Sequence, residues 1–267
     1  MTRIRFSLSN KMFRGCHPAP QVWQELVDWY QTALGSRLAI EEKLLLDEIL
    51  PNLFGYHLCQ LGVVGDVPLY ANSRVSHCFT ADISLLPGQA TQLQCSPFLL
   101  PFRSDSIDVV IVPHLLEFTD QPHEMLREVE RSLISDGHVV ITGINPFSLW
   151  NMWRSVLGWR RQVPWCGRLY SVRRVKDWLA LLGFDVELVH YFFYRPPTKR
   201  SGLLKRLRFI ETVGQKLFRI FGGCYVIVAK KRVTTLTPIR KAWVRRRVVP
   251  GLVEPFSHHE NRTKKTD

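Results

Sequence analysis

Short apolar segments alternate with amphipathic ones along the middle of the chain, and this alternation constrains the fold more than any other feature. Residues 107–112 (IDVVIV) form a nearly unbroken apolar run, as expected for a strand buried on both faces. Residues 122–133 repeat apolar side chains at helical spacing. Strands are predicted at residues 57–62, 75–82, 91–95, 107–112 and 138–143. Strands that alternate with helices predict an α/β fold with a doubly wound, mostly parallel sheet.

Further elements are predicted on both sides of this core. Helices precede it at residues 20–34 and 38–50, and a helix and two strands follow it at residues 171–183, 184–191 and 224–232. Ser171 suits the N-cap of the later helix, and Gly183 suits its end. We therefore divide the chain into an N-terminal helical extension (1–37), a sheet domain (38–232) and a basic tail (233–267) that is expected to be disordered.

The positive charge is concentrated in the last third of the chain. Residues 199–247 carry 15 Lys and Arg against one acid, Glu211, whereas the whole chain has a formal charge of +13. Residues 202–222 predict a basic amphipathic helix, which either packs on the sheet or adsorbs to an anionic membrane. Residues 240–247 either form a charged tail or contact nucleic-acid phosphates. A charged tail is favoured, because no RNA-binding pattern accompanies these residues.

Cysteine spacing and hydropathy indicate the cellular compartment. The six cysteines show no CxxC pair and no neighbouring histidine cluster, so neither a metal site nor a disulfide framework is predicted. No apolar run approaches the roughly 18 residues that a membrane-spanning helix needs. The N-terminus lacks the apolar region of a signal peptide. A cytoplasmic protein is predicted, with peripheral membrane attachment through residues 202–222 as the alternative.

Residues 100–143 resemble the core of the type 11 family of class I S-adenosylmethionine-dependent methyltransferases. The matching positions are Leu100, Pro101, Phe102, Asp108, His114, Leu126, Arg127, Glu128, Arg131, Leu133 and Gly137. The leading helices and the NPFSLW segment are similar to a bacterial subgroup of this family. The resemblance implies a Rossmann-like, seven-stranded sheet in the domain 38–232, mostly parallel with an antiparallel last strand. It also implies S-adenosylmethionine as the cofactor, bound across the carboxyl ends of the first strands.

The loop after the first strand is where the resemblance implies contacts with the cofactor. The family has Asp-x-Gly-x-Gly-x-Gly there, and glycines let the backbone approach the ligand closely. In this chain Gly62 matches the first glycine, Gln60 replaces the aspartate and Val64 replaces the second glycine. Gly65 serves as a displaced glycine, and Val63 lies between them. Gln60 can hydrogen-bond the ammonium group of the cofactor without supplying charge; the alternative is an ordinary turn that binds nothing.

The ends of the later strands supply the remaining predicted contacts. Asp82 ends the second strand, where the family uses a carboxylate to accept hydrogen bonds from both ribose hydroxyls; the alternative is a surface turn. Ser96 stands where the family has an acid that binds the adenine amino group, and Pro97 and Phe98 follow it beside the ring. Pro113, at the end of the fourth strand, completes the predicted cofactor site.

Methyl transfer from a sulfonium needs alignment of donor and acceptor above all, and a base only if the acceptor must lose a proton. His114, just after the fourth strand, is the candidate base. The alternative is a structural histidine that packs the loop.

These features together predict methyl transfer by in-line displacement to a small-molecule or lipid-like acceptor. The alternatives are a non-catalytic protein of the same fold, with a degenerate cofactor loop, and an RNA-associated protein that uses the basic tail.

Overall fold

The computed structural model describes residues 19–62, 68–82, 92–148, 150–151, 166–194 and 219–232. The helices in this part of the chain are α1 (Ala19–Tyr30), α2 (Ala33–Ile49), α3 (Pro122–Ser132) and α5 (Val172–Leu181), with short 3-10 turns η1 (Leu50–Asn52), η2 (Leu116–Phe118) and η4 (Arg219–Phe221). The strands are β1 (His57–Leu61), β2 (His77–Asp82), β3 (Leu93–Gln94), β4 (Ile107–Pro113), β5 (Leu133–Ile144), β6 (Phe184–Phe192) and β7 (Cys224–Lys231).

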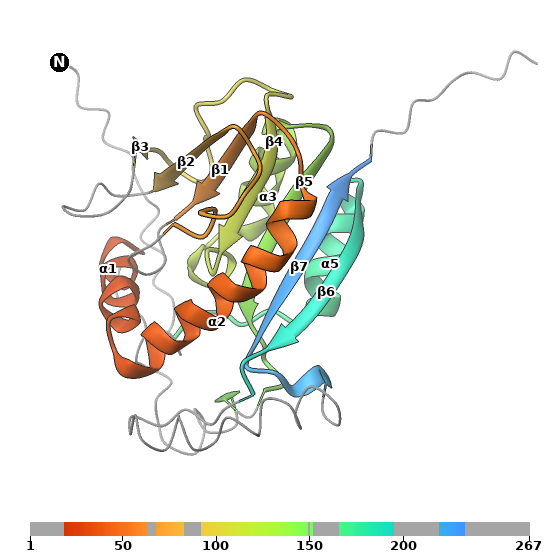
Figure 1. Cartoon of the computed structure of the whole chain (residues 1–267). Coiled ribbons are helices and arrows are strands. Elements are labelled where there is room, and N and C mark those ends of the chain that lie inside the picture. Colours follow the sequence, from red (N-terminus) through yellow and green to blue (C-terminus); the bar gives the residue numbers. More distant parts are fainter. Residues whose placement is uncertain are drawn as a thin grey trace, which may run out of the picture. The chain divides into compact units, whose positions relative to one another are not determined.

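The seven strands form one sheet in the order β3-β2-β1-β4-β5-β7-β6 (Figure 1). Strands β1 to β5 pair in parallel, and β7 runs antiparallel to both β5 and β6. The predicted α/β sheet with an antiparallel last strand is therefore confirmed. From β1 the chain continues to β2 and β3 on one side of the sheet, and it then crosses to β4 on the other side of β1. Doubly wound sheets form a crevice at such a switch point.

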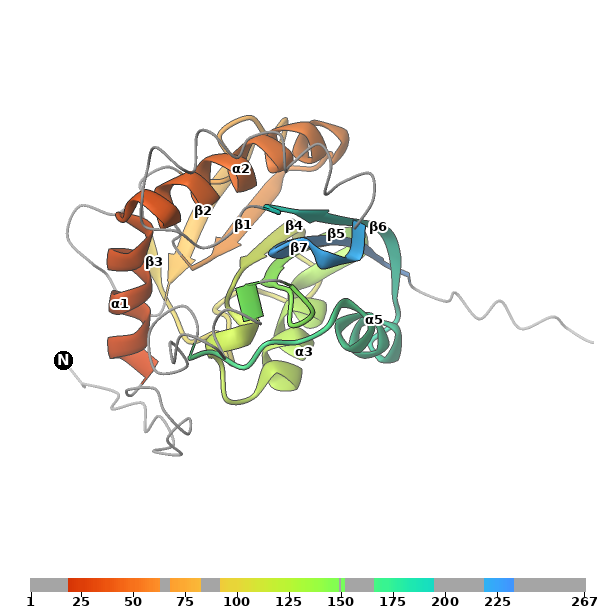
Figure 2. The ribbon, with the colours of Figure 1, turned by 90° about the horizontal axis from the view of Figure 1, so that it is seen from below.

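Helices cover both faces of the sheet. Helix α2 lies against one face, and α3 and α5 lie against the other (Figure 2). Apolar side chains from the helices and the central strands, such as Leu46, Val110 and Val129, are completely buried in one core. Burial on both faces explains why β4 is apolar at every position except Asp108.

The N-terminal helices belong to this core. Thr32 caps α2 by accepting a hydrogen bond from the Gly35 amide at 3.2 Å. A Cβ at Gly35 would lie 2.3 Å from the carbonyl oxygen of Trp29, so the close contact between α1 and α2 requires glycine. Helix α2 runs through residue 37 without a break, so the predicted extension and the sheet domain share one helix and one compact unit. The basic tail, 233–267, lies outside the described residues.

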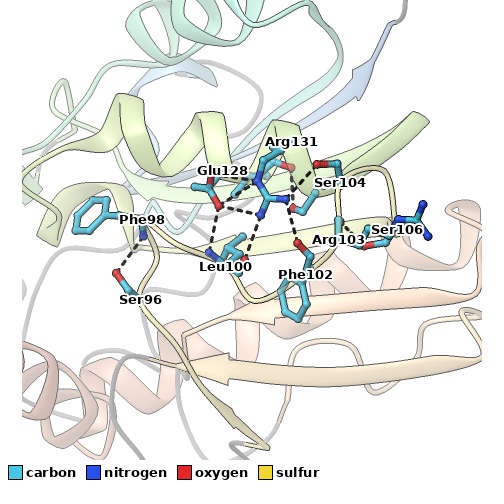
Figure 3. A network of polar contacts seen from close by, with 11 residues as sticks. Ser96, Phe98, Leu100, Phe102, Arg103, Ser104, Ser106, Glu128 and Arg131 are labelled. Atoms are coloured by element: carbon cyan, nitrogen blue, oxygen red, sulfur yellow. Dashed lines mark hydrogen bonds and ion pairs between the residues drawn. The ribbon is translucent and has the colours of Figure 1, made fainter. Parts of the chain in front are cut away.

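Several residues that carry the family resemblance hold the backbone in place. The Asp108 carboxylate accepts hydrogen bonds from the amides of Tyr56 and His57, at 3.0 and 2.9 Å, and thereby fixes the start of β1. Arg131 on α3 donates to Glu128 and to the carbonyl oxygens of Leu100 and Phe102 (Figure 3). The turn before β4 is thus attached to α3 by charge-assisted hydrogen bonds.

Replacing Arg131 with alanine is expected to lower the free energy of unfolding by about 2 kcal/mol, because two backbone carbonyls and Glu128 lose a charged donor. Urea denaturation measures the change. Arg127→Ala is the matched control, since Arg127 lies on the same helix with an exposed side chain. Equal stability of the two variants would contradict the role assigned to Arg131.

Two further expectations concern the cysteines and membrane association. Cys59, Cys78, Cys95 and Cys224 are free thiols, whereas Cys166 is disulfide-bonded, which the sequence did not lead us to expect. Across the described ranges, no helix combines the length and apolarity needed to cross a membrane.

Candidate functional site

The carboxyl ends of the parallel strands surround a recess of about 190 Å³, a volume that includes its open mouth. Its walls come from the ends of β1 and β2, the segment after β3 and the turn after β4. The lining residues are Leu61, Gly62, Ala81, Asp82, Cys95, Pro97 and Leu115. Three of the predicted site residues, Gly62, Asp82 and Pro97, therefore come together in one place.

Gly62 ends β1 at the edge of the recess. Its φ of +90° lies in the left-handed region, which side-chain-bearing residues rarely adopt. The Gly62 amide donates to the carbonyl oxygen of Ala81 at 2.7 Å and so ties the start of the loop to β2. Glycine is thus required by the backbone conformation at this position. The predicted contacts Val63 and Gly65 lie outside the described residues.

Gln60 forms side-chain hydrogen bonds with the segment after β1 and is not one of the residues that line the recess. Its buried side chain accepts a hydrogen bond from the Leu69 amide at 2.9 Å and donates one to the Gly62 carbonyl oxygen at 2.9 Å. An ionised aspartate, the family residue here, has no donor for the second bond. The replacement by glutamine therefore has a structural reason. Contact between Gln60 and the cofactor stays a prediction.

Asp82 ends β2 with its side chain 2% exposed, and it lines the recess. Burial first, and then the Asp82 carboxylate, raise the pKa of the neighbouring Cys95 thiol to about 11. Cys95 is therefore a neutral thiol at physiological pH. The recess thus has mostly apolar walls, with the buried Asp82 among its lining residues.

The other predicted contacts lie beside the recess. The Ser96 hydroxyl accepts a hydrogen bond from the Phe98 amide at 3.3 Å and closes a local turn (Figure 3). Phe98 is half-buried next to the lining residue Pro97. Pro113 is the buried last residue of β4, two positions before the lining residue Leu115. Their contacts with a ligand stay predictions.

His114 lies in a buried ionic cluster. The His114 side chain is 1% exposed, and its φ of +49° is unusual for a residue with a side chain. Its Nε2 atom lies 3.3 Å from Oε1 of Glu42 on α2, and its Nδ1 atom lies 3.5 Å from Oε1 of Glu117 in η2. The same Glu117 oxygen accepts a hydrogen bond of 2.5 Å from the Ile144 amide at the end of β5. The cluster therefore connects α2, the turn after β4 and the end of β5.

The two carboxylates change the titration of His114. Burial alone would lower its pKa, but the charge of Glu42, together with the interaction with Glu117, outweighs burial and raises the pKa from 6.5 to about 10. The imidazole is then protonated at neutral pH, when it has no lone pair to take up a further proton. The predicted role of His114 as a base therefore requires this residue to lose its proton first.

A pH dependence of stability follows from this pKa. Because the folded-state pKa of His114 is raised, its stabilising contribution is complete below the unfolded pKa of about 6.5 and is lost as pH rises through about 10. Between about pH 7 and 8.5, the wild type is expected to lose up to about 1.4 kcal/mol per pH unit relative to a His114→Gln variant. Urea denaturation at several pH values measures this; parallel pH profiles would refute it.

Sequence reasoning missed both carboxylates of this cluster. Glu42 lies one helical turn from both Leu38 and Leu46, in the buried stripe of α2, and is itself fully buried. A charged residue within an apolar stripe was therefore the available signal. Glu117 follows His114 by three residues, but its burial depends on packing that no local pattern shows. Four lining residues were missed, namely Leu61, Ala81, Cys95 and Leu115. The first three lie at the ends of predicted strands, and Leu115 lies three residues after one.

Comparison with known proteins identifies the family. A model of the methyltransferase domain matches residues 70–141. The uncharacterized protein YafS of Escherichia coli (strain K12) is 32% identical over 219 residues, covering 82% of this chain and 84% of that protein. The chain belongs to the type 11 family of S-adenosylmethionine-dependent methyltransferases.

Solved structures agree with the fold of this methyltransferase. A Thermotoga maritima S-adenosylmethionine-dependent methyltransferase superimposes with a TM-score of 0.58 and 17% identity, over 80% of this chain and 100% of that one. An Archaeoglobus fulgidus methyltransferase gives 0.50 and 22%, over 71% and 92%. The methyltransferase-domain match supports an enzyme that uses S-adenosylmethionine, the cofactor named for these two solved relatives. The domain match begins after Glu42 and β1, so Glu42 is not among the matched positions.

Proposed function

We propose that this methyltransferase transfers the methyl group of S-adenosylmethionine to a small-molecule or lipid-like acceptor by in-line displacement. The observation that carries the proposal is the recess at the carboxyl ends of β1, β2 and β4, with the buried Asp82 in its wall. A crevice at this switch point, with few polar groups among apolar walls, is typical of nucleotide sites in doubly wound sheets.

The residues of the recess fit the cofactor. Asp82 would accept hydrogen bonds from the ribose hydroxyls, and Gly62 would let the backbone approach the amino-acid end. The apolar side chains of Cys95, Pro97 and Leu115 would cover the adenine. When bound, the cofactor supplies a methyl group already activated on a sulfonium. The protein's own part is then to orient the two reactants and to exclude water from between them.

The predicted contacts of Gln60, Val63, Gly65, Ser96, Phe98 and Pro113 belong to the same proposal. In addition, the raised pKa of His114 favours an acceptor that reacts without giving a proton to this residue. Such an acceptor either carries a free lone pair already or loses its proton to water.

The proposed contact with an anionic membrane depends on residues 202–222, of which only 219–222 are described. The 3-10 turn η4 exposes Ile220 and Phe221 there, with 60% and 48% of their surfaces accessible. Membrane association and RNA binding through 233–267 remain predictions, because the segments that would carry them lie outside the described residues.

Isothermal titration calorimetry with S-adenosylmethionine and with S-adenosylhomocysteine tests the proposal. We expect saturable binding of both ligands by the folded protein. Binding should be followed by assay of S-adenosylhomocysteine release with small amines, phenols and isoprenoid compounds as acceptors. Folded protein that gives no heat with either ligand at millimolar concentration would end the methyl-transfer proposal and favour a non-catalytic protein of this fold.

A further inference from the structure

We propose that Glu42 is a positioning residue for the cofactor recess: through His114 it holds the turn after β4, and with it Leu115, in the conformation that borders the recess. This inference rests on the proposed function and deepens it. It assigns a task in the reaction to α2, a helix that lies outside the matched methyltransferase domain.

The turn after β4 adopts a conformation that needs external support. His114 has a left-handed backbone, with φ of +49°, and such a conformation is unfavourable for a residue with a Cβ. The His114 amide donates to the Thr142 carbonyl oxygen at 3.1 Å, which attaches the turn to β5. Leu115, the next residue, forms part of the recess wall. Any rotation of the backbone at His114 would therefore move a wall of the recess.

The ionic cluster supplies this support from two sides. Glu42 faces one nitrogen of the His114 ring at 3.3 Å and Glu117 faces the other at 3.5 Å, so the ring is held between α2 and η2. Glu117 is fixed in turn by its hydrogen bond from the Ile144 amide. The two nitrogens thus bind the turn to a helix on one side and to a strand end on the other.

Among the described residues, the polar partner of Glu42 is His114. Among the described residues, neither of its carboxylate oxygens accepts a hydrogen bond, so its ion pair with His114 is what offsets the burial of its charge. A buried ion pair commonly stabilises a protein no better than well-packed apolar side chains would. Leu38 and Leu46 flank Glu42 on the same stripe of α2, where a leucine would pack in its place. The presence of a carboxylate at this position therefore indicates a function.

Other titratable groups face the cluster. The Tyr30 ring on α1 lies with its centroid 6.3 Å from that of His114, and Tyr225 on β7 lies beside Glu117. Burial, followed by Glu42 for Tyr30 and by Glu117 for Tyr225, raises the pKa of both phenols well above 10. Cys224 on β7 also raises the pKa of both phenols. Because both phenols stay neutral at physiological pH, the charge of the cluster there is set by Glu42, Glu117 and His114.

The test compares Glu42→Gln and Glu42→Leu with Glu48→Gln, an exposed glutamate on the same helix. Calorimetry at pH 7.5 measures the dissociation constant for S-adenosylmethionine. Both Glu42 variants are expected to bind about 10-fold more weakly, whereas Glu48→Gln should stay within about twofold of the wild type. Both Glu42 variants remove one of the two carboxylates beside His114 and are expected to be less stable to urea than the wild type. Binding is therefore compared at a temperature where the circular dichroism of each variant matches that of the wild type, so that weaker binding cannot be assigned to unfolding.

The pH profile of binding gives a second readout. Because the amino group of the ligand titrates at about pH 8, each affinity is divided by that of Glu48→Gln at the same pH. This ratio should stay constant for the wild type, whereas for Glu42→Gln it should fall further at a pH below about 10 because one of the two carboxylates that retain the His114 proton is gone. Wild-type affinity and pH profile in both Glu42 variants would overturn the positioning role while leaving the proposed function intact. Absence of binding by the wild type would overturn the proposed function and this inference together.

Discussion

Replacing Asp82 with alanine is expected to weaken the binding of S-adenosylmethionine by about 30- to 100-fold. The Asp82 carboxylate lies at the end of β2, 2% exposed, in the wall of the recess. A carboxylate that accepts two hydroxyl hydrogen bonds contributes about 2.0–2.8 kcal/mol relative to its absence, which corresponds to this loss of affinity. Calorimetric titration of folded variant and wild type gives the ratio directly.

Two controls make the Asp82 result specific. Asp120→Ala removes an exposed aspartate just before α3, away from the recess lining, and should bind the cofactor like the wild type. Adenine alone carries no ribose, so its weaker binding should change little in Asp82→Ala. If Asp82→Ala bound S-adenosylmethionine with unchanged affinity, the ribose role of Asp82 would be wrong.

The second large effect concerns stability. Glu117→Ala is expected to lower the free energy of unfolding by about 3–5 kcal/mol, because breaking a buried charge pair is costly. The substitution leaves His114 with Glu42 as its remaining anion, and it removes the acceptor for the Ile144 amide. A buried amide without a partner adds its own penalty. The alanine also leaves a cavity between η2 and β7, beside Tyr225.

Urea denaturation at pH 7.5 measures this loss for Glu117→Ala. Glu48→Ala is the control, because its exposed side chain should change the free energy of unfolding by less than about 0.5 kcal/mol. A loss for Glu117→Ala no larger than that of the control would show that the cluster does not hold the turn after β4 to the end of β5.

Local sequence patterns predicted the elements of the fold closely. The apolar run at 107–112 became β4, residues 107–113, and the predicted helix at 122–133 became α3. Strand β5 is longer than predicted, starting at Leu133 instead of residue 138, because its first residues lack the apolar pattern. The side chains of a segment determine which of its positions are buried, so these helices and strands can be predicted without knowing which elements pack against them.

The resemblance to the family was carried mainly by residues with structural tasks. Asp108 fixes the start of β1, and Glu128 and Arg131 attach the turn before β4 to α3. A match at such positions predicts the fold well because these contacts recur wherever the same turns must be held. It reveals little about the acceptor, since none of these three residues lines the recess.

The sequence by itself determined the strand and helix order, the class of sheet and the place of Gly62 and Asp82 at strand ends. Tertiary structure alone decided that Gln60 bonds to its own loop and that His114 lies between Glu42 and Glu117. The physical reason is the range of the interactions. The pattern of buried apolar side chains repeats within one segment and can be read from it. His114 meets Glu42 only when helix α2, which is far away in the sequence, packs near the end of β4.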